Sequence, residues 1–210
     1  MSSWLDHLQH YRAIAVIRSA NIEQGVQMAQ AVATGGMKFI EITWNSEQPE
    51  VLIERLRQSL PHCYIGTGTI LNPEQMQRAI AAGAQFIFSP HVDSALITIA
   101  NEAGIPMIPG ALTPTEMVRA WQAGATCVKV FPIQAVGGAS YIKALQGPLG
   151  QIPLIPTGGV TLENAKDFIE AGAIAVGLSS QLFPPDLLRV GDWRAIAQRA
   201  QHFQTQLNDS

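Results

Sequence analysis

The sequence predicts an α/β protein built as a single (β/α)₈ barrel domain over residues 1–210. Short runs rich in β-branched residues alternate with amphipathic, helix-like stretches along the whole chain. Hydrophobic residues make up 47% of the chain and charged residues only 14%, a balance typical of compact α/β proteins. Because each helix returns the chain to a parallel neighbouring strand, the pattern describes repeated βαβ units, and eight of them close into a barrel.

The predicted strands read as continuous apolar runs, as strands covered on both faces do. They are AIAVIR (13–18), KFIEIT (38–43), YIGTGT (64–69), QFIFSP (85–90), PMIPG (106–110), CVKVF (127–131), LIPTGG (154–159) and IAVGLS (174–179). A chain of 210 residues lies near the small end for a TIM barrel. The alternative fold is an open doubly wound sheet, but no G-x-G-x-x-G follows the first run, where AVIRSANIEQG stands.

The predicted helices carry start and stop signals. The clearest stretches are 21–36, 72–84, 113–125 and 161–173. Three of them open with a cap residue followed by proline or an early carboxylate: Asn72-Pro73-Glu74, Thr113-Pro114 with Glu116, and Thr161 with Glu163. Gly83, Gly124 and Gly172 each stand in an Ala-Gly-Ala triplet, where a helix C-cap needs positive φ. Residues 2–11 are predicted to form an extra short helix that closes the bottom of the barrel.

Composition and charge exclude several classes of partner. The formal charge of −3 comes from 13 basic and 16 acidic residues without a run of one sign, so we expect no nucleic-acid or membrane surface. No apolar run approaches the roughly 20 residues of a spanning helix. Cys63 and Cys127 are expected to be free thiols, and the polar start MSSWLDHLQHYR does not resemble a signal peptide. We therefore expect a cytoplasmic protein that acts on a small molecule.

Polar residues interrupt the apolar strands near their ends, where the active sites of these barrels lie. They are Arg18, Glu41, Thr43, Thr67, Thr69, Lys129, Thr157-Gly158-Gly159 and Gly177-Leu178-Ser179-Ser180. Each has a structural explanation when taken alone. Glu41 and Lys129 could form a buried ion pair, the threonines are good strand formers, Gly158-Gly159 could be a turn, and Arg18 could be a solvated strand end.

Taken together, these residues favour covalent chemistry on a carbonyl compound. An amine held in an apolar barrel is available as a nucleophile, so Lys129 could form a Schiff base with a ketone. The protonated imine stabilises the carbanion or enamine left when a neighbouring carbon–carbon bond breaks. Glu41 could move the protons, directly or through one water. A lysine and one carboxylate suffice for aldol cleavage.

A metal would be the other way to stabilise an enolate, but its ligand cluster is missing from the sequence. Of the histidines, only His91 in SPHVD follows a strand at a candidate catalytic face, and a polar loop residue is the simpler interpretation. We expect neither metal nor cofactor. The loops after the seventh and eighth strands favour phosphate binding, because Gly158, Gly159, Ser179 and Ser180 could form a cradle of backbone amides.

The motifs resemble those of the 2-keto-3-deoxy-6-phosphogluconate (KDPG) aldolase family, which includes enzymes acting on 4-hydroxy-2-oxoglutarate (KHG). They are EITWNS (41–46), IGTGTILNPEQ (65–75), FSPHVD (88–93), IPG (108–110), VKVFP (128–132), GGASYIKALQGP (137–148) and PTGGV (156–160). The resemblance implies a class I aldolase, usually homotrimeric, of the Entner–Doudoroff pathway. It implies cleavage of KDPG to pyruvate and glyceraldehyde 3-phosphate and of KHG to pyruvate and glyoxylate. Decarboxylation of oxaloacetate needs the same iminium, so we expect it as a side reaction.

The resemblance also implies roles for individual residues. It assigns the Schiff base to Lys129, acid/base catalysis to Glu41, a contact with the pyruvate part to Thr69, the pocket wall to Pro90 and Phe131, and phosphate binding to Gly158, Gly159 and Ser180.

Two positions depart from the family pattern. Some members carry an arginine where this chain has Asn45, and Arg18 occurs in members that lack it, so Arg18 is assigned the substrate carboxylate. Ser179 stands where glycine is usual, which could narrow the phosphate cradle or add a hydroxyl.

Three alternatives remain open. Asn45 also resembles the galactonate-series members, so 2-keto-3-deoxy-6-phosphogalactonate is a second candidate substrate. A phosphate-binding barrel isomerase or synthase would use no covalent intermediate. A non-catalytic binding protein would retain the barrel without turnover.

Overall fold

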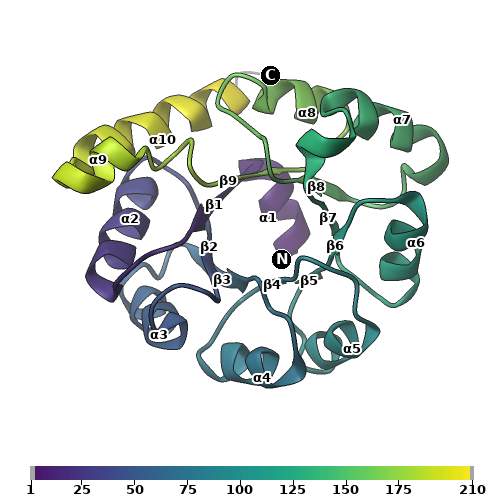
Figure 1. The fold of residues 1–210 in the computed structure, drawn as a ribbon, viewed down its shortest axis with the longest axis horizontal. Coiled ribbons are helices and arrows are strands. Elements are labelled where there is room, and N and C mark those ends of the chain that lie inside the picture. The colour runs from purple at the N-terminus through teal and green to yellow at the C-terminus, as the bar shows by residue number, and fades with distance from the viewer. Residues whose placement is uncertain (1–2, 209–210) are drawn as a thin grey trace.

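The computed structural model describes residues 3–208, and in it a ring of parallel strands is surrounded by helices (Figure 1). The strands are β1 (Ala13–Ile17), β2 (Phe39–Thr43), β3 (Tyr64–Gly68), β4 (Ile87–Phe88), β5 (Met107–Ile108), β6 (Gly110–Ala111), β7 (Val128–Val130), β8 (Leu154–Pro156) and β9 (Val176–Leu178). The helices are α1 (Trp4–Tyr11), α2 (Ile22–Thr34), α3 (Pro49–Ser59), α4 (Pro73–Ala81), α5 (Ser94–Glu102), α6 (Pro114–Gln122), α7 (Ala139–Leu149), α8 (Ala165–Glu170), α9 (Pro185–Val190) and α10 (Trp193–Asn208), with a 3₁₀ turn at η1 (Ile133–Val136). The predicted (β/α)₈ architecture is confirmed.

The fifth predicted strand is split in two. Pro109 separates β5 from β6 because proline has no N–H to continue the ladder. β5 pairs with β4 in one sheet, ordered β5-β4-β3-β2-β1-β9, and β6 pairs with β7 in the other, ordered β6-β7-β8. On the other side, a bridge between Thr157 and Gly177 joins β8 to β9. The two sheets are therefore parts of one closed barrel.

Side chains alternate between the inside of the barrel and the helix layer, as the pleat of a strand requires. In β2, Ile40 and Ile42 pack toward the helices, whereas Phe39 belongs to a second buried cluster inside the ring. That inner cluster consists of Leu8, Ile14, Val16, Phe39, Phe86, Phe88, Ile108, Cys127, Ile155 and Ala175. Glu41, two residues after Phe39, and Lys129, two after Cys127, therefore face the inside.

α1 closes one end of the ring, as predicted. Its Trp4 ring meets the Phe39 ring edge-on at a centroid distance of 5.6 Å, and Leu8 is fully buried in the inner cluster. A capping box between Ser3 and Asp6 starts the helix. In Figure 1, α1 lies across the opening of the strand ring. Because this end of the barrel is closed, a substrate has to enter from the opposite end.

Most predicted helix boundaries are confirmed. Asn72 and Thr113 cap α4 and α6 through their side chains, and the glycines of the three Ala-Gly-Ala triplets have φ between 83° and 103°. The helix predicted from Thr161 begins later, at Ala165. The backbone N–H groups of Thr161 and Asn164 each donate to the other residue's side-chain oxygen, and this local turn replaces the first helical turn.

The strands are shorter than their apolar runs, most clearly at 85–90, where only Ile87–Phe88 is regular. Ser89 N–H still donates to Ile108 O at 3.3 Å, and Ser89 Oγ donates to the His91 carbonyl at 2.6 Å, so the chain turns away after Ser89. Cys63 and Cys127 are buried free thiols, as expected. Within residues 3–208, no helix is long and apolar enough to cross a membrane.

Candidate active site

Two charged side chains, Glu41 and Lys129, lie inside the barrel toward the end opposite α1. They are 1% and 7% exposed. Their strands, β2 and β7, are the second and sixth around the eight-membered ring, and so stand on opposite sides of it. The ion pairs of the described part of the chain are Arg55–Glu23, Arg78–Glu50 and Arg189–Asp186, so Glu41 and Lys129 do not form a direct pair. The structure therefore does not contain the Glu41–Lys129 ion pair that the sequence analysis considered.

The Glu41 carboxyl occupies space that a glycine leaves open. A Cβ added to Gly68 would lie 1.8 Å from Glu41 Oε1. Oε1 is buried without a hydrogen-bond partner among residues 3–208. Burial raises the pKa of Glu41, and the charges of Lys129 and then Arg18 oppose this increase. A carboxyl whose pKa is raised holds a proton more readily, which suits a group that takes up and returns a proton during a reaction.

Lys129 is held by its strand and surrounded by aromatic rings. Its backbone N–H donates to the Pro109 carbonyl at 2.9 Å, which fixes the residue at the split between β5 and β6. Its Nζ lies 5.0 Å from the ring centroid of Phe131 and 5.5 Å from that of Phe88. The nitrogen lies near these two rings and makes no carboxylate contact within residues 3–208. The nitrogen therefore remains accessible to an electrophile in the barrel mouth.

Thr69 has a strained backbone at the mouth of the barrel. Its φ is 63°, in the left-handed region that side-chain-bearing residues rarely adopt. Backbone hydrogen bonds hold it from both sides, from Trp44 N–H to Gly68 O at 2.7 Å and from Ile70 N–H to Phe88 O at 3.3 Å. Such strain costs about 1–3 kcal/mol and clusters at functional sites. The position fits the substrate contact that the sequence predicts.

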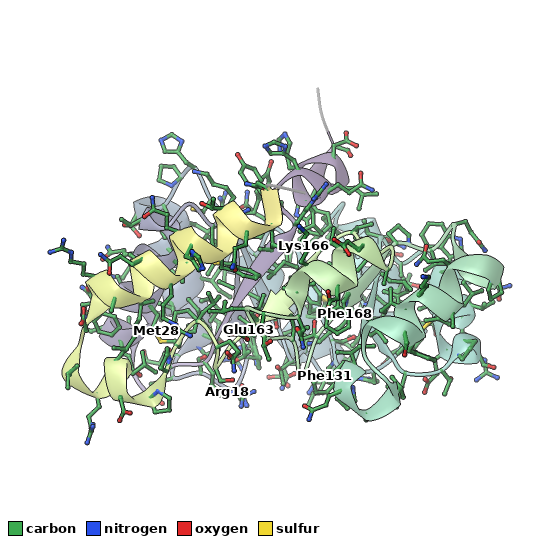
Figure 2. The ribbon with its side chains drawn as sticks, turned by 90° about the horizontal axis from the view of Figure 1, so that it is seen from above. Arg18, Met28, Phe131, Glu163, Lys166 and Phe168 are labelled. Atoms are coloured by element: carbon green, nitrogen blue, oxygen red, sulfur yellow. The ribbon has the colours of Figure 1, made fainter. Side chains whose placement is uncertain are left out.

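Arg18 follows β1 and lies at the rim. Its Nε donates to Asn45 Oδ1 at 3.2 Å, so the structure brings Arg18 together with the residue that stands where some family members carry an arginine. In Figure 2, Arg18 and Phe131 both lie along the lower edge of the molecule, away from the N-terminal helix drawn in purple. The Arg18 charge also lowers the pKa of Glu41, which places the guanidinium within electrostatic range of the carboxyl.

Pro90 and Phe131 line a cavity of about 450 Å³ beside the barrel mouth, together with His91, Gly110 and Arg119. Neither Glu41 nor Lys129 lines this cavity, so the cavity lies beside these two charged side chains and does not include them. Phe131 is 37% exposed and separates the two spaces, since its ring also contacts Lys129. His91 lines the cavity from the loop after β4, consistent with a polar loop residue.

The two predicted phosphate loops lie side by side, because the Thr157–Gly177 bridge joins them at their roots. Gly158 and Gly159 have φ of 81° and 99°, and a Cβ at Gly159 would lie 2.4 Å from Gln134. Ser179 and Ser180 are exposed at the end of β9. Within residues 3–208, no acceptor is recorded for the backbone N–H groups of Gly159 and Ser180. These loops thus present unpaired donors next to one another.

Sequence reasoning missed the residues that shape the site without reacting. Gly68 makes room for the Glu41 carboxyl, and Phe88 provides an aromatic face to Lys129. Both lie in the quoted motifs GTGT and FSP. The alternation of side chains along β3 and β4 places both positions on the inward face, and this alternation is the signal that could have identified them. No group of three His, Cys, Asp or Glu side chains in the described residues is arranged to hold a metal ion.

A family model for KDPG and KHG aldolases matches residues 5–199. The chain belongs to this family. A 2-dehydro-3-deoxy-phosphogluconate aldolase of Dickeya dadantii (strain 3937) is 36% identical over 187 residues, covering 89% of this chain and 88% of the relative. The KHG/KDPG aldolase of Escherichia coli (strain K12) is 34% identical over 187 residues, with the same coverage of both chains. These relatives are aldolases, and the chain is accordingly a carbon–carbon lyase.

Solved structures agree with the family assignment. The KDPG aldolase from Legionella pneumophila, with pyruvate captured as a covalent carbinolamine, has a TM-score of 0.88 at 27% identity, covering 96% of this chain and 98% of that one. A native KDPGal structure has a TM-score of 0.81 at 34% identity, covering 93% and 96%. A 3-hexulose-6-phosphate synthase, at 16% identity with a TM-score of 0.73 and coverage of 91% and 99%, shares the fold alone.

Proposed function

We propose that this aldolase cleaves KDPG to pyruvate and glyceraldehyde 3-phosphate through a Schiff base on Lys129, with Glu41 transferring the protons. One observation carries the proposal. An amine and a carboxyl with a raised pKa stand on opposite sides of a barrel that α1 closes at the far end, and they do not pair directly with each other. A ketone bound between them would have a nucleophile on one side and a proton acceptor on the other.

The reaction follows from these two positions. The Lys129 amine adds to the C2 ketone, and loss of water from the carbinolamine leaves a protonated imine. Glu41 accepts the proton of the C4 hydroxyl, the C3–C4 bond breaks, and its electron pair moves to the iminium nitrogen, which releases the aldehyde and leaves an enamine. Return of a proton to C3 restores the iminium, and water hydrolyses it to pyruvate and free Lys129.

The surrounding residues suit the other parts of the substrate. The Arg18 guanidinium at the rim is proposed to bind the carboxylate, because a planar fork matches that group. Thr69, Pro90 and Phe131 are proposed to contact the pyruvate part. The loops that carry Gly158, Gly159, Ser179 and Ser180 are proposed to bind the phosphate through their backbone N–H groups. The Ser179 side chain adds a hydroxyl where the family usually has glycine.

The proposal includes further substrates. A relative named KHG/KDPG aldolase supports KHG as a second substrate, and the likeness to the native KDPGal structure keeps the galactonate epimer as the alternative. Decarboxylation of oxaloacetate would use the same iminium. A homotrimer is proposed as well, and a solved protein cage designed by fusing symmetric oligomeric domains is 32% identical, with a TM-score of 0.82. It covers 94% of this chain and 75% of that one. A cytoplasmic location completes the proposal.

Trapping with pyruvate and borohydride, followed by peptide mass spectrometry, tests the mechanism. We expect a reduced pyruvyl adduct on Lys129 and none on the Lys143 peptide, which serves as an internal control in the same digest. The Lys129→Ala variant should form no adduct and show no turnover. A folded wild-type protein that forms no adduct in excess pyruvate would favour the non-covalent isomerase or synthase, or the binding protein.

A further inference from the structure

We infer that Asn45 is a positioning residue for the keto-acid carboxylate: its side-chain oxygen holds Arg18 Nε so that the two terminal nitrogens of the guanidinium face the substrate. The inference rests on the proposed function, because it specifies how Arg18 performs its part. Its basis is the 3.2 Å hydrogen bond from Arg18 Nε to Asn45 Oδ1, which joins the loops after β1 and β2.

Asn45 lies on a short loop that is fixed on both sides. Trp44 N–H donates to Gly68 O at 2.7 Å, which ties the start of the loop to β3. Glu47 N–H donates to Ser19 O at 3.1 Å, and Ser19 N–H donates to Ser46 Oγ at 3.2 Å. Ser19 and Ser46 are both buried, so these bonds are protected from water. Their loop therefore presents Asn45 Oδ1 at a defined position beside Arg18.

This contact determines which edge of the guanidinium remains available. A guanidinium binds a carboxylate either through Nε with one terminal nitrogen or through both terminal nitrogens. Asn45 occupies Nε, so the end formed by Nη1 and Nη2 is left for the substrate. Arg18 and Asn45 are both exposed, and without this bond the long arginine side chain would sample many rotamers. Asn45 therefore reduces the ordering cost of binding.

The arrangement also separates carboxylate binding from phosphate binding. Arg18 and Asn45 follow β1 and β2, whereas the proposed phosphate loops follow β8 and β9. Asn45 is therefore expected to affect every 2-keto acid equally, whether it carries a phosphate or not. This differs from a role in distinguishing the sugar chains of the substrates, which would affect some substrates and leave pyruvate unchanged.

A double-mutant cycle tests the inference, with the pyruvate concentration that gives half-maximal borohydride trapping and KM for KDPG as the two readouts. Asn45→Ala should raise both by roughly 3- to 12-fold while kcat stays within about twofold, because only pre-organisation is lost. Arg18→Ala should raise both further. In the Arg18→Ala background, adding Asn45→Ala should change neither by more than about twofold, because Asn45 acts only through Arg18.

Asn101→Ala is the matched control, because its amide also bonds across two segments, to Gly124 O at 3.2 Å. It lies in the last turn of α5, which leads to the start of β5, at the end of the barrel opposite the strand ends that carry the site. It should leave both readouts unchanged. Equal effects of Asn45→Ala in the two backgrounds, or a loss of kcat alone, would overturn the inference. If wild-type protein formed no adduct on Lys129, the proposed function would fail instead, so the two failures are distinguishable.

Discussion

Replacing Gly68 with alanine should impair catalysis through a single methyl group. The new Cβ would lie 1.8 Å from Glu41 Oε1, 2.5 Å from Cδ and 3.1 Å from Cγ, so the carboxyl has to move. Real Cβ atoms do not approach so closely, so the buried Glu41 carboxyl has to shift from its observed position. Overpacking of this kind costs about 1–3 kcal/mol of stability.

The fall in kcat of Gly68→Ala should be larger than its loss of folding stability alone would produce. A displacement of about 1 Å in a catalytic group reduces the rate by about 10²-fold. We therefore expect kcat for KDPG to fall by about two orders of magnitude while the pyruvate adduct on Lys129 still forms, because the amine is unaffected. Pyruvate release in a coupled assay and urea unfolding at the same pH would measure the two effects.

Gly147→Ala provides the control. Gly147 lies within α7, and a Cβ there would meet nothing within 4 Å. Alanine in a helix is favoured over glycine by about 0.5–1 kcal/mol, but Pro148 follows Gly147 and disfavours helical backbone in a preceding residue that has a Cβ. We therefore expect little net change in stability and full activity. If Gly68→Ala retained wild-type kcat, the carboxyl of Glu41 would not need its observed position, and the acid/base assignment would be refuted.

Two further predictions concern charge. Glu41→Gln should reduce kcat by about 10² to 10⁴ while leaving the adduct on Lys129 detectable. Because burial raises the pKa of Glu41 above its value in the unfolded chain, its contribution to stability is complete below the unfolded pKa and is lost as pH rises through the folded pKa. Urea unfolding should therefore show Glu41→Gln stabilising the protein more at pH 8 than at pH 4, and an equal effect at both would contradict the raised pKa. Arg18→Ala should shift the acidic limb of the kcat/KM profile to higher pH, since removing a positive charge raises the pKa of Glu41 further. A profile unchanged in shape would show that Arg18 lies too far away to act on this carboxyl.

Local patterns in the sequence were sufficient for the architecture. Strand runs, helix caps and the Ala-Gly-Ala stops depend on residues a few positions apart, and these signals act before the chain is compact. Lys129 and Glu41 could be singled out for the same reason, because a charge inside an apolar run is costly and therefore conspicuous. The interruption at Pro109 and the turn at Thr161–Asn164 were missed, since each depends on a competing local bond or a missing donor rather than on hydrophobic period.

Other features follow from the closing of the barrel. The sequence places Glu41 and Lys129 in strands, but only the ring of eight puts those strands on opposite sides and prevents a direct ion pair. Only the inward pleat and stagger of neighbouring strands bring Glu41 Oε1 against Gly68, and only loop packing joins Arg18 to Asn45. These contacts connect residues from different strands and loops, and their distances depend on register, twist and packing that no short segment encodes. Residue types and their spacing thus indicate the chemistry, whereas the pKa of the carboxyl and the orientation of the guanidinium arise from the closed tertiary structure.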